Sequence, residues 1–174
     1  LMIIGAFFAV LGAHFTGNPW IGLLTGVAAG MLFSLIHAFG TVTLHLDHVV
    51  SGAVVNILAL GVVKYLMVLV YGHPGTTDPI RTSLADYQLV IPVLSKIPVV
   101  GRAFFAQTPI VYMSFIAVIF FAIYIKKTKN GLHLRASGEH PLALETIGVS
   151  VYKMRYIGII ISGMTSGLAG AYLS

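Results

Sequence analysis

The first 46 residues, LMIIGAFFAVLGAHFTGNPWIGLLTGVAAGMLFSLIHAFGTVTLHL (1–46), contain no Asp, Glu, Lys or Arg. A soluble core of this length would need a polar exterior, which such a stretch cannot supply. About 20 apolar residues are enough for one helical crossing of a bilayer, so two crossings fit here. Over the whole chain only 9% of residues are charged, whereas soluble domains carry roughly 25%. The sequence therefore predicts a protein whose solvent is the lipid bilayer.

Five apolar segments predict an all-α, polytopic membrane helix bundle. The expected crossings are residues 1–13, 20–39, 49–71, 110–125 and 156–174. Both ends of the chain fall inside apolar runs. We therefore expect a single transmembrane domain over 1–174 that is cut at both ends from a longer protein.

The two long connections between these segments differ in charge. The connection 72–109 contains five prolines, which break long helices and indicate an irregular loop. The connection 126–155 holds six of the ten basic residues of the chain. Because basic loops are favoured on the cytoplasmic side, we expect 126–155 inside and 72–109 outside, in a multi-pass protein of the cell membrane. Alternation then places 40–48 inside and 14–19 outside.

Small residues recur every four positions in two of the expected crossings. They are Gly22, Gly26 and Gly30 in one segment and Gly163, Gly167 and Ala171 in the other. This spacing lets helix backbones approach closely in lipid, where the usual hydrophobic drive for helix association is absent. Two interpretations stay open: packing within the bundle, and a subunit interface or sliding contact.

The most informative stretch is SGEHPLALETIG (137–148). Pro141 suits the first position of a helix, where its missing N–H costs nothing. The residues after it favour a short helix, and Gly148 can end that helix in the left-handed conformation. Ser150 can then cap the helix that enters the membrane from Val151. The pattern predicts a two-turn helix with defined ends, held between two crossings.

Such a helix has two possible roles. It can present a rigid shape to a partner protein, or it can lie passively on the lipid headgroups. Glu139 and Glu145 would gain little from an anionic surface, which argues against the passive role.

Several stretches together resemble one family of transport proteins. They are NGLHLRASGEHP (130–141), ETIGVSV (145–151), SGMTSGLAGA (162–171), VVSGAVVNILA (49–59) and GNPW (17–20). The family is that of the branched-chain amino acid, ribose and nucleoside permeases of bacterial ATP-binding-cassette (ABC) importers, and the nucleoside branch is the most similar. His140 replaces the Asn that is usual in the family, and Asn130 stands where Phe is frequent. Both departures leave the ends of the short helix unchanged.

The resemblance implies that the short helix is a coupling helix, which sits in a cleft of a separate ATP-binding subunit. The contact residues that it implies are Glu139, Pro141, Leu142, Ala143, Glu145 and Thr146. It also implies that the helix containing Ser51 and Asn56 lines the translocation pathway. For Asn56 alone, a hydrogen bond between helices that only stabilises packing explains the amide slightly better.

The same resemblance implies the partners and the cargo. The expected partners are a second permease subunit, identical or homologous, two cytoplasmic ATP-binding subunits and an external solute-binding protein, with no nucleic acid. No cofactor is expected on this chain, because it lacks the Gly-x4-Gly-Lys-Ser/Thr phosphate loop. ATP and Mg are used by the partner subunit, and the implied cargo is a nucleoside or a simple sugar.

The alternative function is a secondary transporter or channel that is not coupled to ATP. Such proteins place ionisable residues within their crossings, and here only Lys64 and some histidines are available. His45, Asp47 and His48 could suggest a metal site, with His37 as a further ligand, but an interfacial loop explains them better. With no cysteine, no nucleophile turn and no paired carboxylates, the chain is not expected to be an enzyme.

Overall fold

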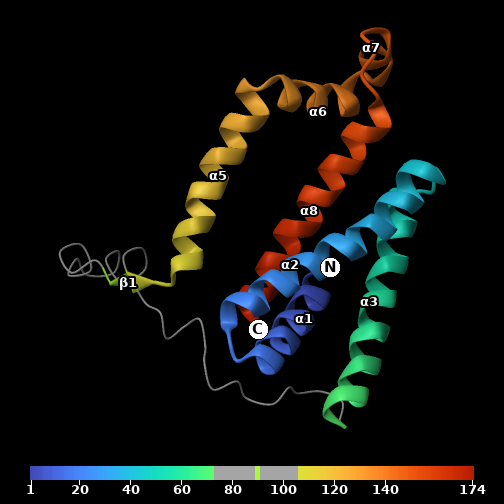
Figure 1. The fold of residues 1–174 in the computed structure, drawn as a ribbon. Coiled ribbons are helices and arrows are strands. Elements are labelled where there is room, and N and C mark those ends of the chain that lie inside the picture. The colour runs from blue at the N-terminus through green and yellow to red at the C-terminus, as the bar shows by residue number, and fades with distance from the viewer. Residues whose placement is uncertain (73–88, 91–105) are drawn as a thin grey trace.

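The structure, a computed structural model, describes residues 1–72, 89–90 and 106–174. Its helices, in chain order, are α1 (Met2–Thr16), α2 (Pro19–Ala38), the π-helical segment η1 (Phe39–Thr43), α3 (His48–Tyr71), α5 (Pro109–Lys127), α6 (Lys129–Glu139), α7 (Pro141–Thr146) and α8 (Val151–Leu173). Two short strands, β1 (Leu89–Val90) and β2 (Ala106–Gln107), pair antiparallel. The all-α prediction is confirmed, and Figure 1 shows the arrangement. Most of the loop expected at 72–109 lies outside the described residues.

Four helical stretches are long and apolar enough to cross a membrane. They are Pro19–Thr43, which joins α2 to η1, and the helices α3, α5 and α8. The apolar helix α1 has 15 residues and is shorter than the usual crossing. The architecture is a polytopic helical membrane bundle.

Residues near the helix ends explain where α2 and α3 begin. The side chain of Asn18 accepts a hydrogen bond from the backbone N–H of Trp20 at 3.0 Å, and Pro19 occupies the first turn of α2. The carboxylate of Asp47 accepts from the N–H of Val49 at 2.7 Å at the start of α3. These contacts satisfy backbone donors that a helix leaves without partners at its N-terminus.

The helices α1, α2 and α8 form the closely packed part of the molecule. A Cβ added at Gly30 would lie 2.6 Å from the carbonyl oxygen of Gly163 and 2.7 Å from the Cα of Gly167. A Cβ at Gly26 would lie 2.7 Å from the carbonyl oxygen of Gly5 in α1. The glycine rows of α2 and α8 therefore face each other within this chain, at a separation that only glycine permits.

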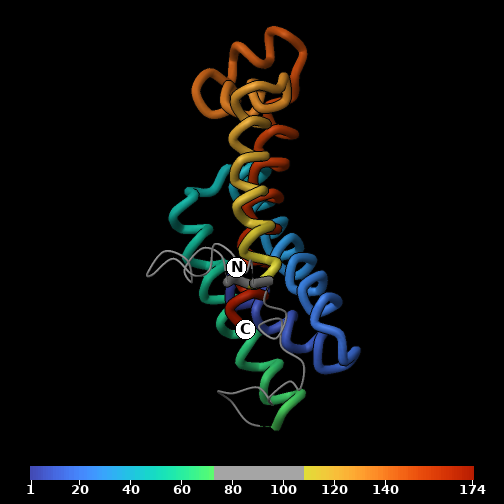
Figure 2. The backbone as a smooth tube through the Cα atoms, turned by 90° about the vertical axis from the view of Figure 1, so that its left-hand side faces the viewer, coloured from blue at the N-terminus to red at the C-terminus, as the bar shows by residue number. Residues whose placement is uncertain are grey.

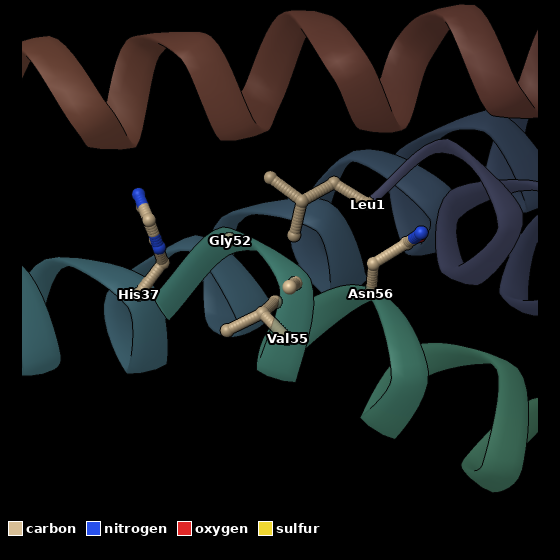
Figure 3. A pocket seen from close by; sticks show the side chains of 6 residues that line it. Leu1, His37, Gly52, Val55 and Asn56 are labelled. Atoms are coloured by element: carbon tan, nitrogen blue, oxygen red, sulfur yellow. The ribbon is translucent and has the colours of Figure 1, made fainter. Parts of the chain in front are cut away.

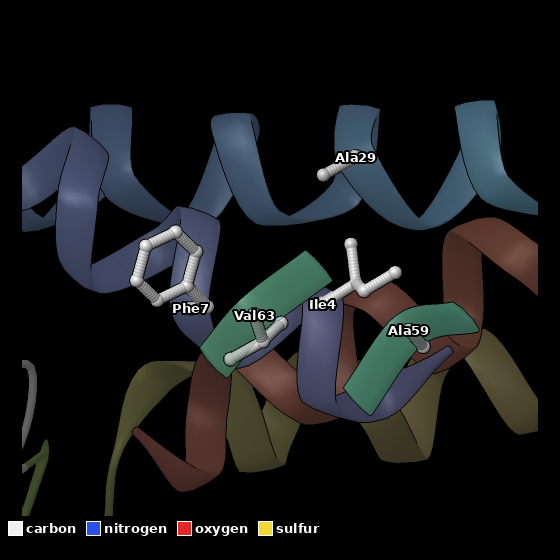
Figure 4. Packing of buried hydrophobic residues seen from close by; sticks show 5 residues of the cluster. All are labelled: Ile4, Phe7, Ala29, Ala59 and Val63. Carbon is white, nitrogen blue, oxygen red and sulfur yellow. The ribbon is translucent and has the colours of Figure 1, made fainter. Parts of the chain in front are cut away.

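A small apolar cluster attaches α3 to this three-helix core. Its buried members are Ile4 and Phe7 of α1, Ala29 of α2, and Ala59 and Val63 of α3 (Figure 4). Most other side chains of α3 are exposed, so α3 touches the core along one narrow face.

Helices α5, α6 and α7 form an open arch. Helix α6 lies across the ends of α5 and α8, and α7 lies at the extreme end of the molecule (Figures 1 and 2). Ile110 is the single buried residue of α5. The arch therefore offers large apolar and polar surfaces that this chain does not cover.

Two parts of the helix pattern, η1 and α6, differ from the sequence prediction. The helix expected to end at residue 39 continues as η1 to Thr43, so the expected connection 40–48 shrinks to a few residues. Helix α6 occupies part of the expected loop 126–155, and its N-terminus is capped by the Thr128 hydroxyl, which accepts from the Gly131 N–H at 3.0 Å. Helix α8 starts at Val151 after Ser150, as the sequence predicted, and its polar first turns lie outside the expected crossing 156–174.

Candidate functional site

The first candidate region is α7 with the residues that flank it. Leu144 is only 1% exposed and anchors α7 to its neighbours. Gly148, with φ of 78°, comes after the helix, and its N–H donates to the Glu145 carbonyl at 3.0 Å. The Val149 N–H donates to the Leu144 carbonyl, also at 3.0 Å. The ends of this helix, with Pro141 at the start and Gly148 after the end, agree with the sequence prediction.

The residues expected to contact an ATP-binding subunit lie together on the outside of this region. Exposed among them are Glu139, Leu142, Ala143, Glu145 and Thr146, while Pro141 is half-buried. We call these six residues, together with Ile147, the α7 surface. Leu142 is 76% exposed and Ile147 65% exposed, although both are large and apolar. An apolar surface bordered by two carboxylates is typical of a protein contact.

Basic residues lie on the elements next to α7 in the chain: the end of α5, helix α6 and the first turns of α8. Lys126, Lys127, Lys129, Arg135 and Lys153 are all exposed. Arg155 also is exposed, and its guanidinium donates to the Ser137 carbonyl at 3.5 Å, which ties α8 to α6. Salt bridges to Glu139 or Glu145 are absent within the described part of the chain.

The second candidate region is a cavity between α2, α3 and the start of α1. It is partly open, has a volume of about 440 Å³ and is lined by Leu1, His37, Gly52, Ala53, Val55 and Asn56. Figure 3 shows the side chains of His37, Leu1 and Asn56 on the same side of α3. We call it the α2–α3 cavity.

Of the two pathway residues expected from the sequence, only Asn56 lines the cavity. Ser51 is 6% exposed, and its hydroxyl lies 3.0 Å from Nδ1 of His37. A Cβ added at Gly40 of η1 would lie 3.2 Å from Oγ of Ser51, so the π-helical segment packs directly beside this pair. Ser51 therefore contacts His37, which lines the cavity.

The connection between α2 and α3 also contacts the first turns of α8. The hydroxyls of Thr43 and Tyr156 are 2.6 Å apart, and the Tyr152 hydroxyl lies 3.2 Å from Nε2 of His45. These bonds join segments more than 100 residues apart in the sequence. They place the α2–α3 connection and the start of α8 at the same end of the molecule.

The histidines of this connection do not gather as metal ligands. His45 bonds to Tyr152, and Asp47 caps α3. Across residues 1–72, 89–90 and 106–174, no three His, Asp or Glu side chains lie close enough to hold a metal ion together.

Sequence reasoning missed His37 as a lining residue and considered it only as a metal ligand. The available signal was its place in the last turn of a crossing that contains no charged residue. A polar ring at such a position needs a partner, and the structure supplies Ser51.

Comparison with known proteins settles the family. The family model described as "Branched-chain amino acid transport system / permease component" matches residues 1–174. The chain belongs to this permease family. It is therefore a multi-pass membrane protein of a permease family, as the sequence predicted.

Several relatives also align with nearly the whole chain. The guanosine ABC transporter permease protein NupQ of Bacillus subtilis is 45% identical over 98% of this chain and 54% of its own length. The nucleoside ABC transporter permease protein NupC of Lactococcus lactis is 38% identical over 98% of this chain and 55% of its own length. The putative glucose ABC transporter permease protein TsgC13 of Haloferax volcanii is 34% identical over 100% of this chain and 52% of its own length.

The chain spans about half the length of these curated relatives. No solved structure matches it.

Proposed function

We propose that this chain forms part of the permease subunit of an ABC importer, and that the α7 surface is where a separate ATP-binding subunit docks. The observation that carries the proposal is the contrast inside α7. Leu144 is buried and fixes the helix, while Leu142, Glu145 and Thr146 are exposed. A helix held rigidly with an uncovered face is suited to transmitting force from a partner.

The charge of the same region supports a membrane orientation. Six basic residues lie between the end of α5 and the first turns of α8, which favours a cytoplasmic position for α6 and α7. The contacts of Tyr152 and Tyr156 favour the same side for the α2–α3 connection. The end of α3 and the start of α5 then face outward, towards an external solute-binding protein.

The complete importer in this proposal has two permease subunits, identical or homologous, and two ATP-binding subunits. ATP and Mg are used by the ATP-binding subunits. The names of the relatives, which include guanosine, nucleoside and glucose permeases, support a nucleoside or a simple sugar as cargo. Ser51 and Asn56 belong to the pathway helix α3.

The docking role is tested by reversing one charge on the α7 surface. We expect Glu145→Arg to abolish solute uptake while membrane insertion and expression stay normal, because Glu145 is exposed and its replacement costs little within the chain. Lys129→Glu, an exposed charge reversal on α6, is the matched control and should keep uptake. Normal uptake by Glu145→Arg would refute the docking role.

Orientation is tested separately with a single thiol. The chain contains no cysteine, so a Leu142→Cys substitution introduces a unique thiol within these 174 residues. A membrane-impermeant thiol reagent should label it from the cytoplasmic side, and added ATP-binding subunit should slow that labelling. Labelling from the outer side would contradict the proposed topology.

A further inference from the structure

We propose that the α2–α3 cavity binds the transported solute, that the imidazole of His37 and the amide of Asn56 make the polar contacts, and that Ser51 positions His37. This inference rests on the proposed transport function and names a binding site within it. It assigns an uncharged nucleoside as the class of ligand.

The amide of Asn56 provides the first argument. It lies on α3, within a stretch long and apolar enough to cross the membrane, and it borders the cavity. Among the described side chains and backbone groups, none makes a hydrogen bond to this amide. Asn56 is exposed, so its amide is open to a hydrogen bond from a molecule that enters the cavity, and such a bond offsets the cost of an amide without a partner in an apolar medium.

His37 provides the second argument. Its Nδ1 is engaged with the Ser51 hydroxyl at 3.0 Å, which fixes the plane of the ring. The ring projects from α2 to the side of α3 on which Leu1 and Asn56 also lie, and the other nitrogen is at its outer end (Figure 3). A neutral imidazole has one donor and one acceptor, so engagement of Nδ1 leaves Nε2 for a solute.

The remaining lining indicates the chemistry of the solute. Leu1, Ala53 and Val55 are apolar and Gly52 adds no side chain, while the described lining contains no Asp, Glu, Lys or Arg. A zwitterionic amino acid would find no opposite charge there. Apolar walls with a few hydrogen-bonding groups suit a flat heterocycle with a polar edge, as in a nucleoside. A volume of about 440 Å³ falls in the range of roughly 300–1,000 Å³ that small-molecule sites occupy.

The position of the cavity fits a step of transport. Asn56 follows His48, the first residue of α3, by about 12 Å along the helix axis. With α3 starting on the cytoplasmic side, the polar groups lie in the inner half of the membrane. A solute held there is close to its release into the cell.

Two glycines of α3 offer a matched pair for the test. A Cβ added at Gly52 or at Gly61 meets no atom within 4 Å, so either position accepts a side chain. They are separated by about two and a half helical turns and therefore point to opposite faces of α3. Gly52 lines the cavity and Gly61 does not.

The experiment uses the full permease reconstituted with its ATP-binding subunits and carrying Gly52→Cys or Gly61→Cys. A small charged thiol reagent labels each protein, with guanosine as the probe solute and leucine as the zwitterionic comparison. We expect guanosine to slow labelling of Gly52→Cys at least fivefold, leucine to have no effect, and Gly61→Cys to react at an unchanged rate. Equal labelling of Gly52→Cys with and without guanosine would overturn the assignment.

Side-chain variants in the Gly52→Cys background then test the individual roles. Asn56→Ala and His37→Ala should each raise the guanosine concentration for half-maximal protection about tenfold, as expected when one hydrogen bond to a bound solute is lost. Ser51→Ala should raise it by less, about threefold, and Ser51→Thr, which keeps a hydroxyl, should restore it. His14→Ala, far from the cavity lining, is the control and should behave as the parent.

The outcomes separate this inference from the proposed function. Because Asn56 is exposed and makes no bond within the described chain, Asn56→Ala should fold normally, and unchanged protection in that variant would refute the inference. An ATP-binding subunit that co-purifies while guanosine gives no protection refutes the cavity site alone. Protection by guanosine in a permease that binds no ATP-binding subunit refutes the docking proposal and supports the cavity site.

Discussion

The three-helix core and the arch use their side chains in opposite ways. In the core of α1, α2 and α8, glycines bring backbones together until no side chain fits between them. In the arch of α5, α6 and α7, large apolar residues such as Phe115, Ile116 and Leu142 face outward. The glycine rows of the core thus pack against other residues of this chain, whereas the arch leaves apolar surfaces that lipid or partner proteins can cover. Stability and assembly are therefore controlled by different residues.

The largest effect should come from filling the contact between α2 and α8. In Gly30→Leu the new Cβ alone would lie 2.6 Å from the Gly163 carbonyl oxygen, so the two helices must separate. We expect a loss of at least about 3 kcal/mol, because overpacking and lost helix contacts add. Thermal unfolding in detergent, followed by the yield of monodisperse protein, should report it. Gly61→Leu, where nothing lies within 4 Å, is the control, and equal behaviour of the two variants would refute the packing argument.

A smaller and local effect should come from the loss of the α7 anchor. Leu144→Ala removes a side chain that is 1% exposed, and such truncations cost about 2–4 kcal/mol. The expected result is faster amide hydrogen exchange over 139–150 with little change in the core. Leu142→Ala, at a side chain that is 76% exposed, should leave this exchange unchanged and weaken binding of the ATP-binding subunit. Identical exchange in both variants would contradict the distinction between anchor and contact surface.

The bonds that join the α2–α3 connection to α8 should have a still smaller effect. Tyr156→Phe removes the hydroxyl that lies 2.6 Å from the Thr43 hydroxyl, a loss of about 1 kcal/mol. A drop of a few degrees in the midpoint of thermal unfolding is expected. Tyr152→Phe removes the longer contact of 3.2 Å to His45 and should change the midpoint less. A larger effect of Tyr152→Phe would show that distance does not rank these two contacts.

The smallest effect should come from a hydrogen bond inside the core. The Thr25 hydroxyl donates to the Phe8 carbonyl at 2.9 Å, across the α1–α2 contact. Hydrogen bonds between membrane helices contribute only about 0.6 kcal/mol on average, so Thr25→Val should shift the unfolding midpoint barely at all. A destabilisation as large as that of Gly30→Leu would mean that polar contacts, rather than close backbone packing, hold the core together.

The sequence was sufficient to predict α7 because its limits depend on local chemistry. Pro141, Gly148 and Ser150 each have a strong positional preference near a helix end, and those preferences do not need the rest of the fold. The membrane class could also be predicted from the sequence, because few structures other than membrane-spanning helices accommodate a long stretch without charged residues.

Helix α6 and η1 could not be predicted for physical reasons. Residues 129–139 are polar and include Gly131 and Gly138, which lower helix propensity. Gly131 is required there because its backbone lies against Tyr124 and Ile125 at the sharp turn from α5. A π-helical segment has no sequence pattern that distinguishes it from an α-helix, so η1 could not be predicted from the sequence.

The cavity was only partly predictable, since it depends on tertiary placement. The family resemblance implied Ser51 and Asn56 as pathway residues, but the sequence could not bring His37 beside Ser51 from 14 residues away. That juxtaposition needs the direction in which α3 returns along α2. Long-range pairs of this kind are invisible to local propensity.

Segment η1 sets the rotational phase with which the chain leaves α2. A π-helical turn contains about one residue more than an α-helical turn, and each residue of an α-helix corresponds to a rotation of about 100°. Removing one residue from Phe39–Thr43 would therefore turn the exit direction of the chain, and Ser51 would no longer meet His37. The lining of the cavity thus depends on the residue count of a segment that contributes no side chain to it.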